Sequence, residues 1–153
     1  MYKVKALIND IDQKLNDKAI PIYYNRLVNT SLKLIRSGEY CKEGQCFNYA
    51  TKNYNICNCQ DCLDYIKLRY NKIDIIDIKI NDVVVFFDGF DDNVADEPSE
   101  YNVNHYGIII YTDNTISGTI IRSKWGTTGI FEGRLNDIPD IYGDRVCFYR
   151  KKE

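Results

Sequence analysis

Two runs of consecutive apolar residues place the tightest constraint on the fold. They are Val83 to Phe87 and Gly107 to Ile110, and neither alternates with polar residues. Uninterrupted apolar runs of this length are typical of strands that are covered on both faces. We predict strands over 83–87, 106–111, 119–122 and 145–149, with turn chemistry from Asp113 and Asn114 between the second and third. The second half of the chain is therefore expected to form an antiparallel sheet.

The first seventy residues show helical spacing instead. Apolar residues recur at three- and four-residue steps over 4–15 and again over 27–35, just before Gly38. This pattern predicts two amphipathic helices, followed by a third that begins near Cys46 and a fourth over 61–70. Helices that pack on an antiparallel sheet define an α+β fold, and we expect the amino-terminal helices to cover the sheet.

Length and composition indicate one globular domain spanning residues 1–153. The chain is 44% hydrophobic and 27% charged, which is enough apolar material for a real core. Its net charge of −2 gives no electrostatic reason to expect a nucleic acid or an anionic membrane as partner. The composition leaves the oligomeric state open.

The amino-terminal segment, residues 1–18, mixes Asp, Asn and Gln into its apolar positions. A secretory signal needs an uninterrupted apolar core, and a membrane helix needs about 20 apolar residues. The expected location is therefore the cytoplasm, or a target reached by a route without a cleavable signal peptide.

One cysteine and the single histidine stand where thiol chemistry requires such residues. Cys46 follows Gly44 and Gln45 and precedes a short apolar run, so we expect it at the start of a helix. Backbone N–H groups at that position stabilise a thiolate and lower its pKa. His105 stands at the entrance to an apolar strand, and an imidazole can activate a thiol and later protonate the leaving group. Cys46 and His105 are therefore a candidate catalytic pair.

The order of these motifs resembles that of papain-like amidases of the NlpC and CHAP types. Cys46 comes first, then Asn81-Asp82-Val83 before an apolar strand, then His105-Tyr106-Gly107 and a further strand. The carboxyl-terminal segment, from Ser123-Lys124-Trp125-Gly126 to Tyr142-Gly143, is also similar to a group of small papain-like proteins. The resemblance implies a papain-like core over residues 41–150, with residues 1–40 as a helical amino-terminal extension.

The resemblance also implies roles for residues around the pair. In these amidases a polar residue on the strand after the histidine orients the imidazole, and Ser123 is the best-placed polar side chain here. A neutral hydroxyl departs from the amide, carboxylate or imidazole usual at that position. Apart from the resemblance, Gln45 immediately precedes Cys46, and from this adjacency we expect its amide to donate to an oxyanion beside the Cys46 backbone N–H. Trp125 and Tyr106 are expected to line the substrate groove.

These residues predict a cysteine hydrolase or acyl transferase that acts on an amide bond through a thioester. A protein or peptide is the expected substrate, and the activities that fit are those of a peptidase, an amidase or a protein deamidase, including an effector or toxin. The alternative is a catalytically inactive papain-like module that binds a peptide or partner protein in the same groove. The weak third catalytic position favours that alternative.

A cluster of cysteines offers a second chemistry. Cys57, Cys59 and Cys62 have C-x-C-x-x-C spacing, and Cys41 could supply a fourth thiolate to a zinc ion. A disulfide or redox role and ordinary reduced cysteines are the other interpretations. The catalytic hypothesis requires no cofactor. If His105 completed a zinc site, that hypothesis would lose its base.

The segment 88–100 is strongly acidic and contains no Lys or Arg. A solvated surface loop is the simplest interpretation, and a cation site or a recruiter of basic substrate is the other. Its carboxylates are Asp88, Asp91, Asp92, Asp96, Glu97 and Glu100.

Overall fold

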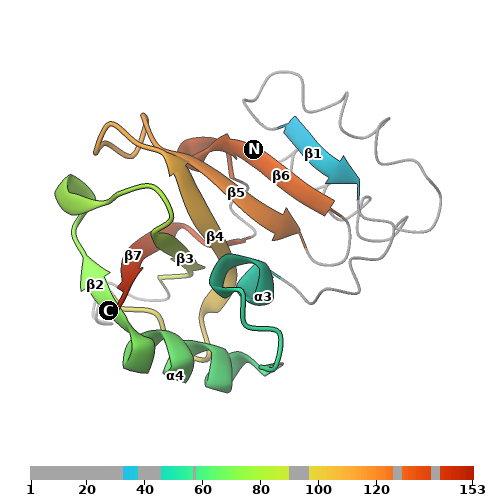
Figure 1. Cartoon of the computed structure of the whole chain (residues 1–153), viewed down its shortest axis with the longest axis vertical. Helices are drawn as coiled ribbons and strands as arrows, with labels where there is room; N and C mark the ends of the chain where they lie inside the picture. The colour runs from blue at the N-terminus through green and yellow to red at the C-terminus, as the bar shows by residue number, and fades with distance from the viewer. Residues whose placement is uncertain (1–32, 38–45, 57, 90–96, 126–128, 139–141) are drawn as a thin grey trace.

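A computed structural model of the whole chain describes residues 33–37, 46–56, 58–89, 97–125, 129–138 and 142–153 (Figure 1). For residues 33–37 and Cys59 the description covers the backbone alone. The strands are β1 (Lys33–Ser37), β2 (Tyr70–Ile73), β3 (Val83–Phe87), β4 (Val103–Tyr111), β5 (Ile120–Trp125), β6 (Gly129–Arg134) and β7 (Arg145–Lys151). The helices are α3 (Cys46–Thr51) and α4 (Cys59–Arg69), and short 3-10 turns cover η1 (Ile75–Asp77) and η2 (Leu135–Asp137).

The strands of the described segments form one antiparallel sheet. Its order is β1-β6-β5-β4-β3-β7-β2, so β4 and β3 lie near the middle. All five residues of β3 are buried, which confirms a strand covered on both faces. The α+β class and the four predicted strands are confirmed, whereas β1, β2 and β6 were not predicted.

The helices near Cys46 and after residue 58 are also confirmed. The side chain of Asn58 caps α4 by accepting a hydrogen bond from the backbone N of Asp61 at 2.8 Å. The helix ends at Arg69, and Tyr70 already belongs to β2, one residue earlier than the prediction placed the boundary. Neither of these helices has the length and apolar character that a membrane span requires.

The prediction of a helix over 27–35 is wrong for its last residues. Lys33–Ser37 form β1, which pairs with β6. Apolar residues at steps of two to four positions fit a short strand as well as a helix, and pairing with a strand about 95 residues later decides the outcome. Residues 1–32, including the helix predicted over 4–15, lie outside the described part of the chain.

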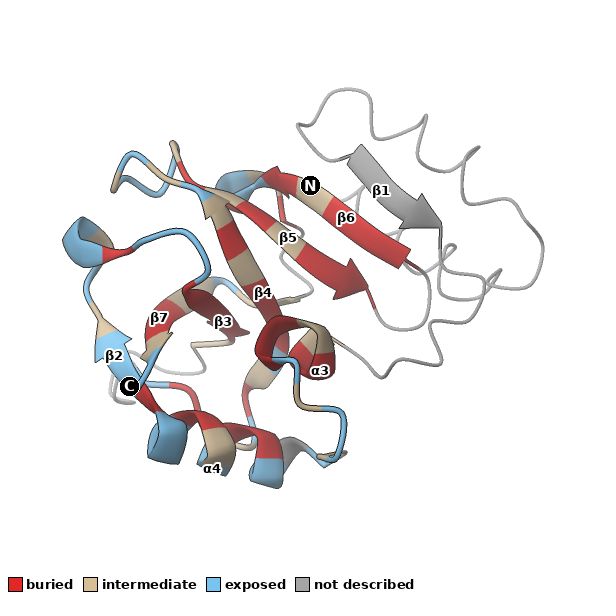
Figure 2. Cartoon of the chain, viewed as in Figure 1, coloured by how far each residue is buried: buried red, intermediate tan, exposed pale blue. Residues whose placement is uncertain are grey.

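The sheet has two differently covered faces. The helix face packs under α3 and α4, and Figure 2 shows the buried sides of these helices turned toward the strands. The connector face packs under the segments that join the strands, including Ile78, Leu135 and Ile138. The strands contribute Val83, Val85, Phe87, Tyr106, Cys147 and Tyr149 to the helix face and Val84, Phe86, Ile109, Ile121, Trp125, Phe131 and Phe148 to the connector face.

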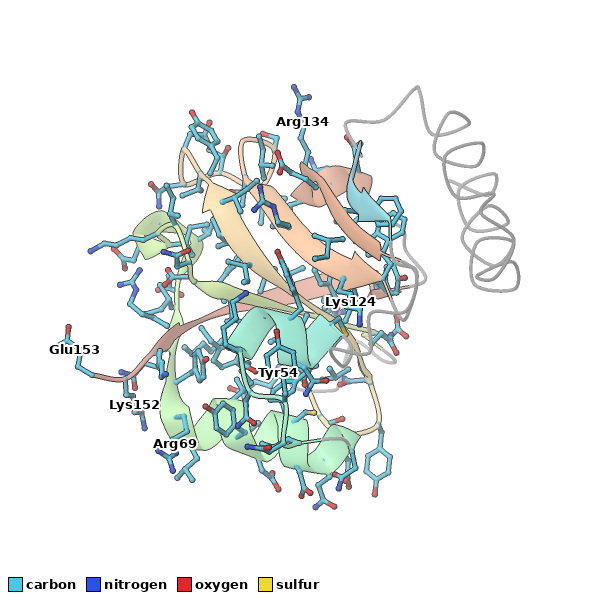
Figure 3. The ribbon with its side chains drawn as sticks, turned by 45° about the vertical axis from the view of Figure 1, so that its right-hand side comes forward. Tyr54, Arg69, Lys124, Arg134, Lys152 and Glu153 are labelled. Carbon is cyan, nitrogen blue, oxygen red and sulfur yellow. The ribbon has the colours of Figure 1, made fainter. Side chains whose placement is uncertain are left out.

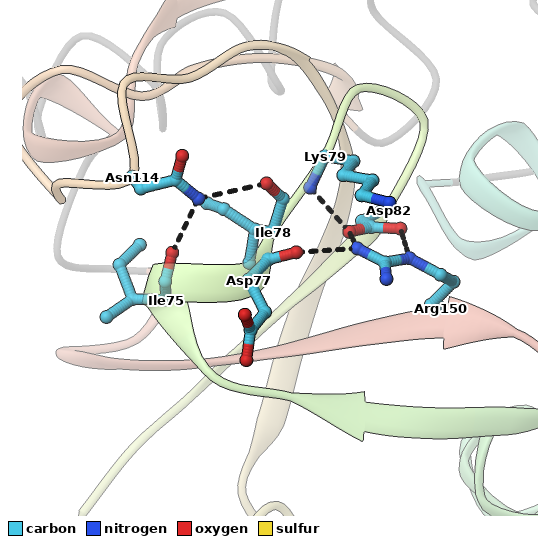
Figure 4. Close-up of polar contacts among 7 residues, drawn as sticks. All are labelled: Ile75, Asp77, Ile78, Lys79, Asp82, Asn114 and Arg150. Atoms are coloured by element: carbon cyan, nitrogen blue, oxygen red, sulfur yellow. Dashed lines mark hydrogen bonds and ion pairs between the residues drawn. The ribbon is translucent and has the colours of Figure 1, made fainter.

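Polar contacts hold the segment between β2 and β3 in place (Figure 4). Arg150 donates to both carboxylate oxygens of Asp82, at 2.9 and 2.7 Å, and to the carbonyl oxygen of Asp77 at 2.7 Å. The Asn114 amide donates to the carbonyl oxygens of Ile75 and Ile78 at 3.1 and 3.0 Å. These bonds satisfy backbone groups that the irregular segment leaves without ladder partners. They fix the connector from which Ile78 enters the core.

Candidate functional site

Cys46 is the first residue of α3, where the sequence predicts it. Its side chain is half-buried and packs against the helix-face cluster. The next residue, Phe47, meets the ring of Tyr106 edge-on, with 5.2 Å between the ring centroids. Cys46 therefore lies on the helix face of the sheet. Gln45 lies outside the described residues.

His105 belongs to the other face. Its side chain is 1% exposed, and its ring stacks on that of Tyr142 with 4.0 Å between centroids. The Phe86 ring lies 5.5 Å away on the same face. Burial lowers the pKa of His105 to about 3, so the imidazole is neutral at pH 7. Within the described part of the chain, its Nε2 atom has no hydrogen-bond partner.

The pairing of β3 with β4 explains why the two residues separate. Val85 lies opposite Tyr106 and Phe86 opposite His105, so adjacent β4 residues face opposite sides. A register shift between Phe86 and Phe87 adds one residue to β4, after which Val103 packs on the helix face. The structure thus places the sheet between Cys46 and His105. The predicted catalytic pair is not brought together.

Ser123 and Trp125 share the connector face with His105. A Cβ on Gly107 would lie 3.3 Å from the Cβ of Ser123, which places Ser123 on this face beside β4. The Ser123 hydroxyl accepts a hydrogen bond from the Trp125 indole N–H at 3.2 Å. Trp125 is 1% exposed and stacks on Phe131 with 4.0 Å between centroids. The predicted groove residue Trp125 is therefore part of the core.

Polar side chains that the sequence analysis missed lie on the same face of the sheet as Cys46. Ile108 lies opposite Arg122, and continuing this register places the buried residues Tyr106 and Lys124 opposite each other on the helix face. Figure 3 shows Lys124 on β5, a strand that α3 contacts. Arg122 bonds to Glu132 at 2.9 Å, and this hydrogen bond raises the Arg122 pKa. The available sequence signal was their spacing. Ile120, Arg122 and Lys124 stand two residues apart along β5 and therefore share one face of the strand.

Of the cysteines predicted to bind zinc, the structure describes the side chain of Cys62 alone. Cys62 is buried at 7% exposure among the apolar residues of the helix face, and His105 lies across the sheet. Among the residues described here, no group of three His, Cys, Asp or Glu side chains could hold a metal ion. Cys41 and Cys57 fall outside the described residues, as does the side chain of Cys59. The zinc interpretation remains a sequence prediction.

The described ends of the acidic segment contact β4 at Asp88 and β2 at Glu97. The Asn104 side chain donates to the Asp88 carboxylate at 2.7 Å, and the backbone N–H of Asp88 donates to Asn102 at 2.9 Å. Glu97 pairs with Lys72 at 3.7 Å. Asp91, Asp92 and Asp96 lie outside the described residues. The described carboxylates at the two ends therefore serve structural contacts.

Comparison with known proteins adds no relative. No family model, no curated protein and no solved structure matches the chain. The similarity to papain-like amidases rests on the motifs described above and remains a sequence-based interpretation.

Proposed function

We propose that this chain is a binding domain for a peptide or a partner protein, without turnover by Cys46 and His105. The observation that carries the proposal is the placement of the two residues on opposite faces of the sheet. A general base must lie within hydrogen-bond reach of the thiol or connect to it through one water. A layer of backbone and packed side chains prevents that approach here.

The electrostatic state of His105 supports the same conclusion. Thiol hydrolases stabilise the thiolate with an adjacent imidazolium. Burial against Phe86 and Tyr142 holds the His105 pKa near 3, so the charged form is suppressed at neutral pH. His105 is the single histidine of the chain, so no second imidazole could serve Cys46.

Exposed apolar side chains at one end of the sheet provide a surface for binding. Ile76 is 72% exposed and Ile80 is 58% exposed, on the segment between β2 and β3. Tyr111 and Ile116, on the hairpin that joins β4 to β5, are also exposed. The Asn114 amide ties this hairpin to the segment that carries Ile76 and Ile80. Gathered exposed apolar residues are typical of interaction sites.

Alkylation of the native protein as a function of pH tests the proposal. We expect the alkylation rate of Cys46, followed by peptide mass mapping, to have the same pH dependence in the wild type and in His105→Gln. Glutamine avoids the cavity that alanine would leave at this buried position, and circular dichroism checks that the variant is folded. A Cys46 pKa well below 8 that returns to normal in His105→Gln would refute the proposal.

A cysteine hydrolase or acyl transferase acting on a protein or peptide amide is the second candidate. Two observations favour it: Cys46 is only half-buried at the first residue of α3, and Nε2 of His105 lacks a partner among the described residues. This candidate requires a rearrangement that brings the imidazole to the thiol. Loss of amide cleavage in Cys46→Ser, with the fold retained, would select it over the binding domain.

A further inference from the structure

A pocket of about 200 Å³ opens on the connector face, next to the exposed apolar surface. Its walls combine apolar and polar groups and come from β3, β7, η2 and the β4–β5 hairpin. Ile116 belongs both to this pocket and to the exposed apolar surface. The apolar wall residues are Phe86, Ile116, Leu135, Ile138 and Val146.

One carboxylate, that of Asp144, stands among these walls. Its Oδ1 atom accepts a hydrogen bond from the backbone N of Gly89 at 2.9 Å, which fixes the side chain. The preceding residue, Gly143, has φ +120° and lies so close to β3 that a Cβ would be 2.6 Å from the Phe87 nitrogen. The backbone that presents Asp144 is therefore held tightly against the sheet.

The neighbouring cation, Arg145, lies opposite Phe87, whose side chain belongs to the helix face. Its guanidinium packs against Gly89, on the residue that bonds Asp144. In the part of the chain described here, the Asp144 carboxylate has one hydrogen bond, from Gly89. Its second oxygen is available to a ligand.

We infer that this pocket binds a lysine side chain of a peptide or partner protein. The apolar walls suit the four-carbon stem of lysine, and Asp144 offers a counter-charge for the ammonium at the pocket rim. With one oxygen engaged by Gly89, Asp144 suits a point charge better than a guanidinium that takes both oxygens. This inference rests on the proposed binding function and names the side chain that is bound.

Nuclear magnetic resonance titration with blocked amino acids tests the inference. The probes are the N-acetyl methylamides of lysine, norleucine, arginine and glutamate, which share a backbone and differ in stem and charge. We expect the lysine probe to shift the amides of Leu135, Asn136 and Asp144 saturably, with an affinity above that of norleucine by up to about fivefold, the upper end of the gain from one exposed ion pair. Glutamate should cause no saturable shift.

A matched pair of variants supplies the control. Asp144→Asn keeps a carbonyl oxygen for the Gly89 bond and removes the charge, so lysine should fall to the affinity of norleucine. Asp113→Asn, on the exposed β4–β5 hairpin outside the pocket, should leave both affinities unchanged. Equal binding of lysine to the wild type and Asp144→Asn, tighter binding of arginine, or absence of pocket shifts would each overturn the inference. Because alkylation of Cys46 alone tests the binding function, the two proposals can fail separately.

Discussion

The two faces of the sheet are covered in different ways. On the helix face, α3 and α4 pack their apolar side chains directly on the strands. On the connector face, irregular segments provide the cover, and side-chain hydrogen bonds from Arg150 and Asn114 hold one of them in place. Regular helices satisfy their own backbone groups, whereas connectors need such partners.

This difference divides the residues predicted to form one site. Cys46 and Tyr106 belong to the helix face, and His105, Ser123 and Trp125 belong to the connector face. Residues that are adjacent in a strand can therefore lie on opposite faces of the sheet. Neighbouring motifs in a sequence indicate a shared site only when their side chains point to the same face.

The largest expected effect is loss of the connector-face core. Trp125→Ala removes a ring that is 1% exposed and stacked on Phe131, so we expect a loss of about 3 to 5 kcal/mol in the free energy of unfolding. Urea denaturation measures it. Phe47→Ala is the corresponding change of a buried aromatic residue on the helix face. Tyr101→Ala, at an 83% exposed position, is the control and should change the free energy of unfolding by less than about 0.5 kcal/mol. A small effect of Trp125→Ala would mean that the connector face is loosely packed.

Removing the Asp82 charge should destabilise the segment between β2 and β3. Asp82 is 4% exposed and receives bonds from Arg150 and from the backbone N of Lys79, so Asp82→Asn should cost about 2 to 3 kcal/mol. We expect amide hydrogen exchange to accelerate over 73–82 while α4 stays protected. An equal increase of the amide exchange rate in α4 would show that α4 and the segment between β2 and β3 open together.

Acid should destabilise the connector face through His105. The pKa is 6.5 for an unperturbed histidine and about 3 in the fold, so between these values the unfolded chain binds the proton and the folded chain does not. The contribution of the neutral imidazole to the free energy of unfolding is fully present above pH 6.5. As the pH drops, the free energy of unfolding decreases by about 2 kcal/mol between pH 7.5 and 5. Urea titrations across this range measure it. In His105→Gln this part of the slope should disappear, and an unchanged slope would contradict the burial of a neutral imidazole.

The smallest effect is expected at the half-buried thiol of the helix face. Cys46→Ala should lower the free energy of unfolding by about 1 kcal/mol or less, because little apolar surface is lost. Cys147→Ala, at a position only 6% exposed, should cost more. Thermal unfolding of both variants gives the ranking, and the reverse order would place Cys46 in the tightly packed core.

Part of the fold could be predicted because local patterns match the final environment. Val83–Phe87 is apolar without interruption, and the structure buries all five of its residues. The segment 33–37 could not be assigned from its own residues, because it becomes a strand by pairing with β6. Lys72 and its neighbours in β2 carry weak strand signals, and pairing with β7 defines that strand.

The sequence by itself determined the α+β class, the position of Cys46 at a helix start and the position of His105 in a strand. Only the tertiary structure decided which face each side chain occupies. Side chains of a strand alternate with period two, and the extra residue in β4 next to Phe86 and Phe87 places Val103 on the face opposite to that of His105, where simple alternation would put both on one face. That register is set by long-range pairing and core packing, which no local pattern around His105 contains.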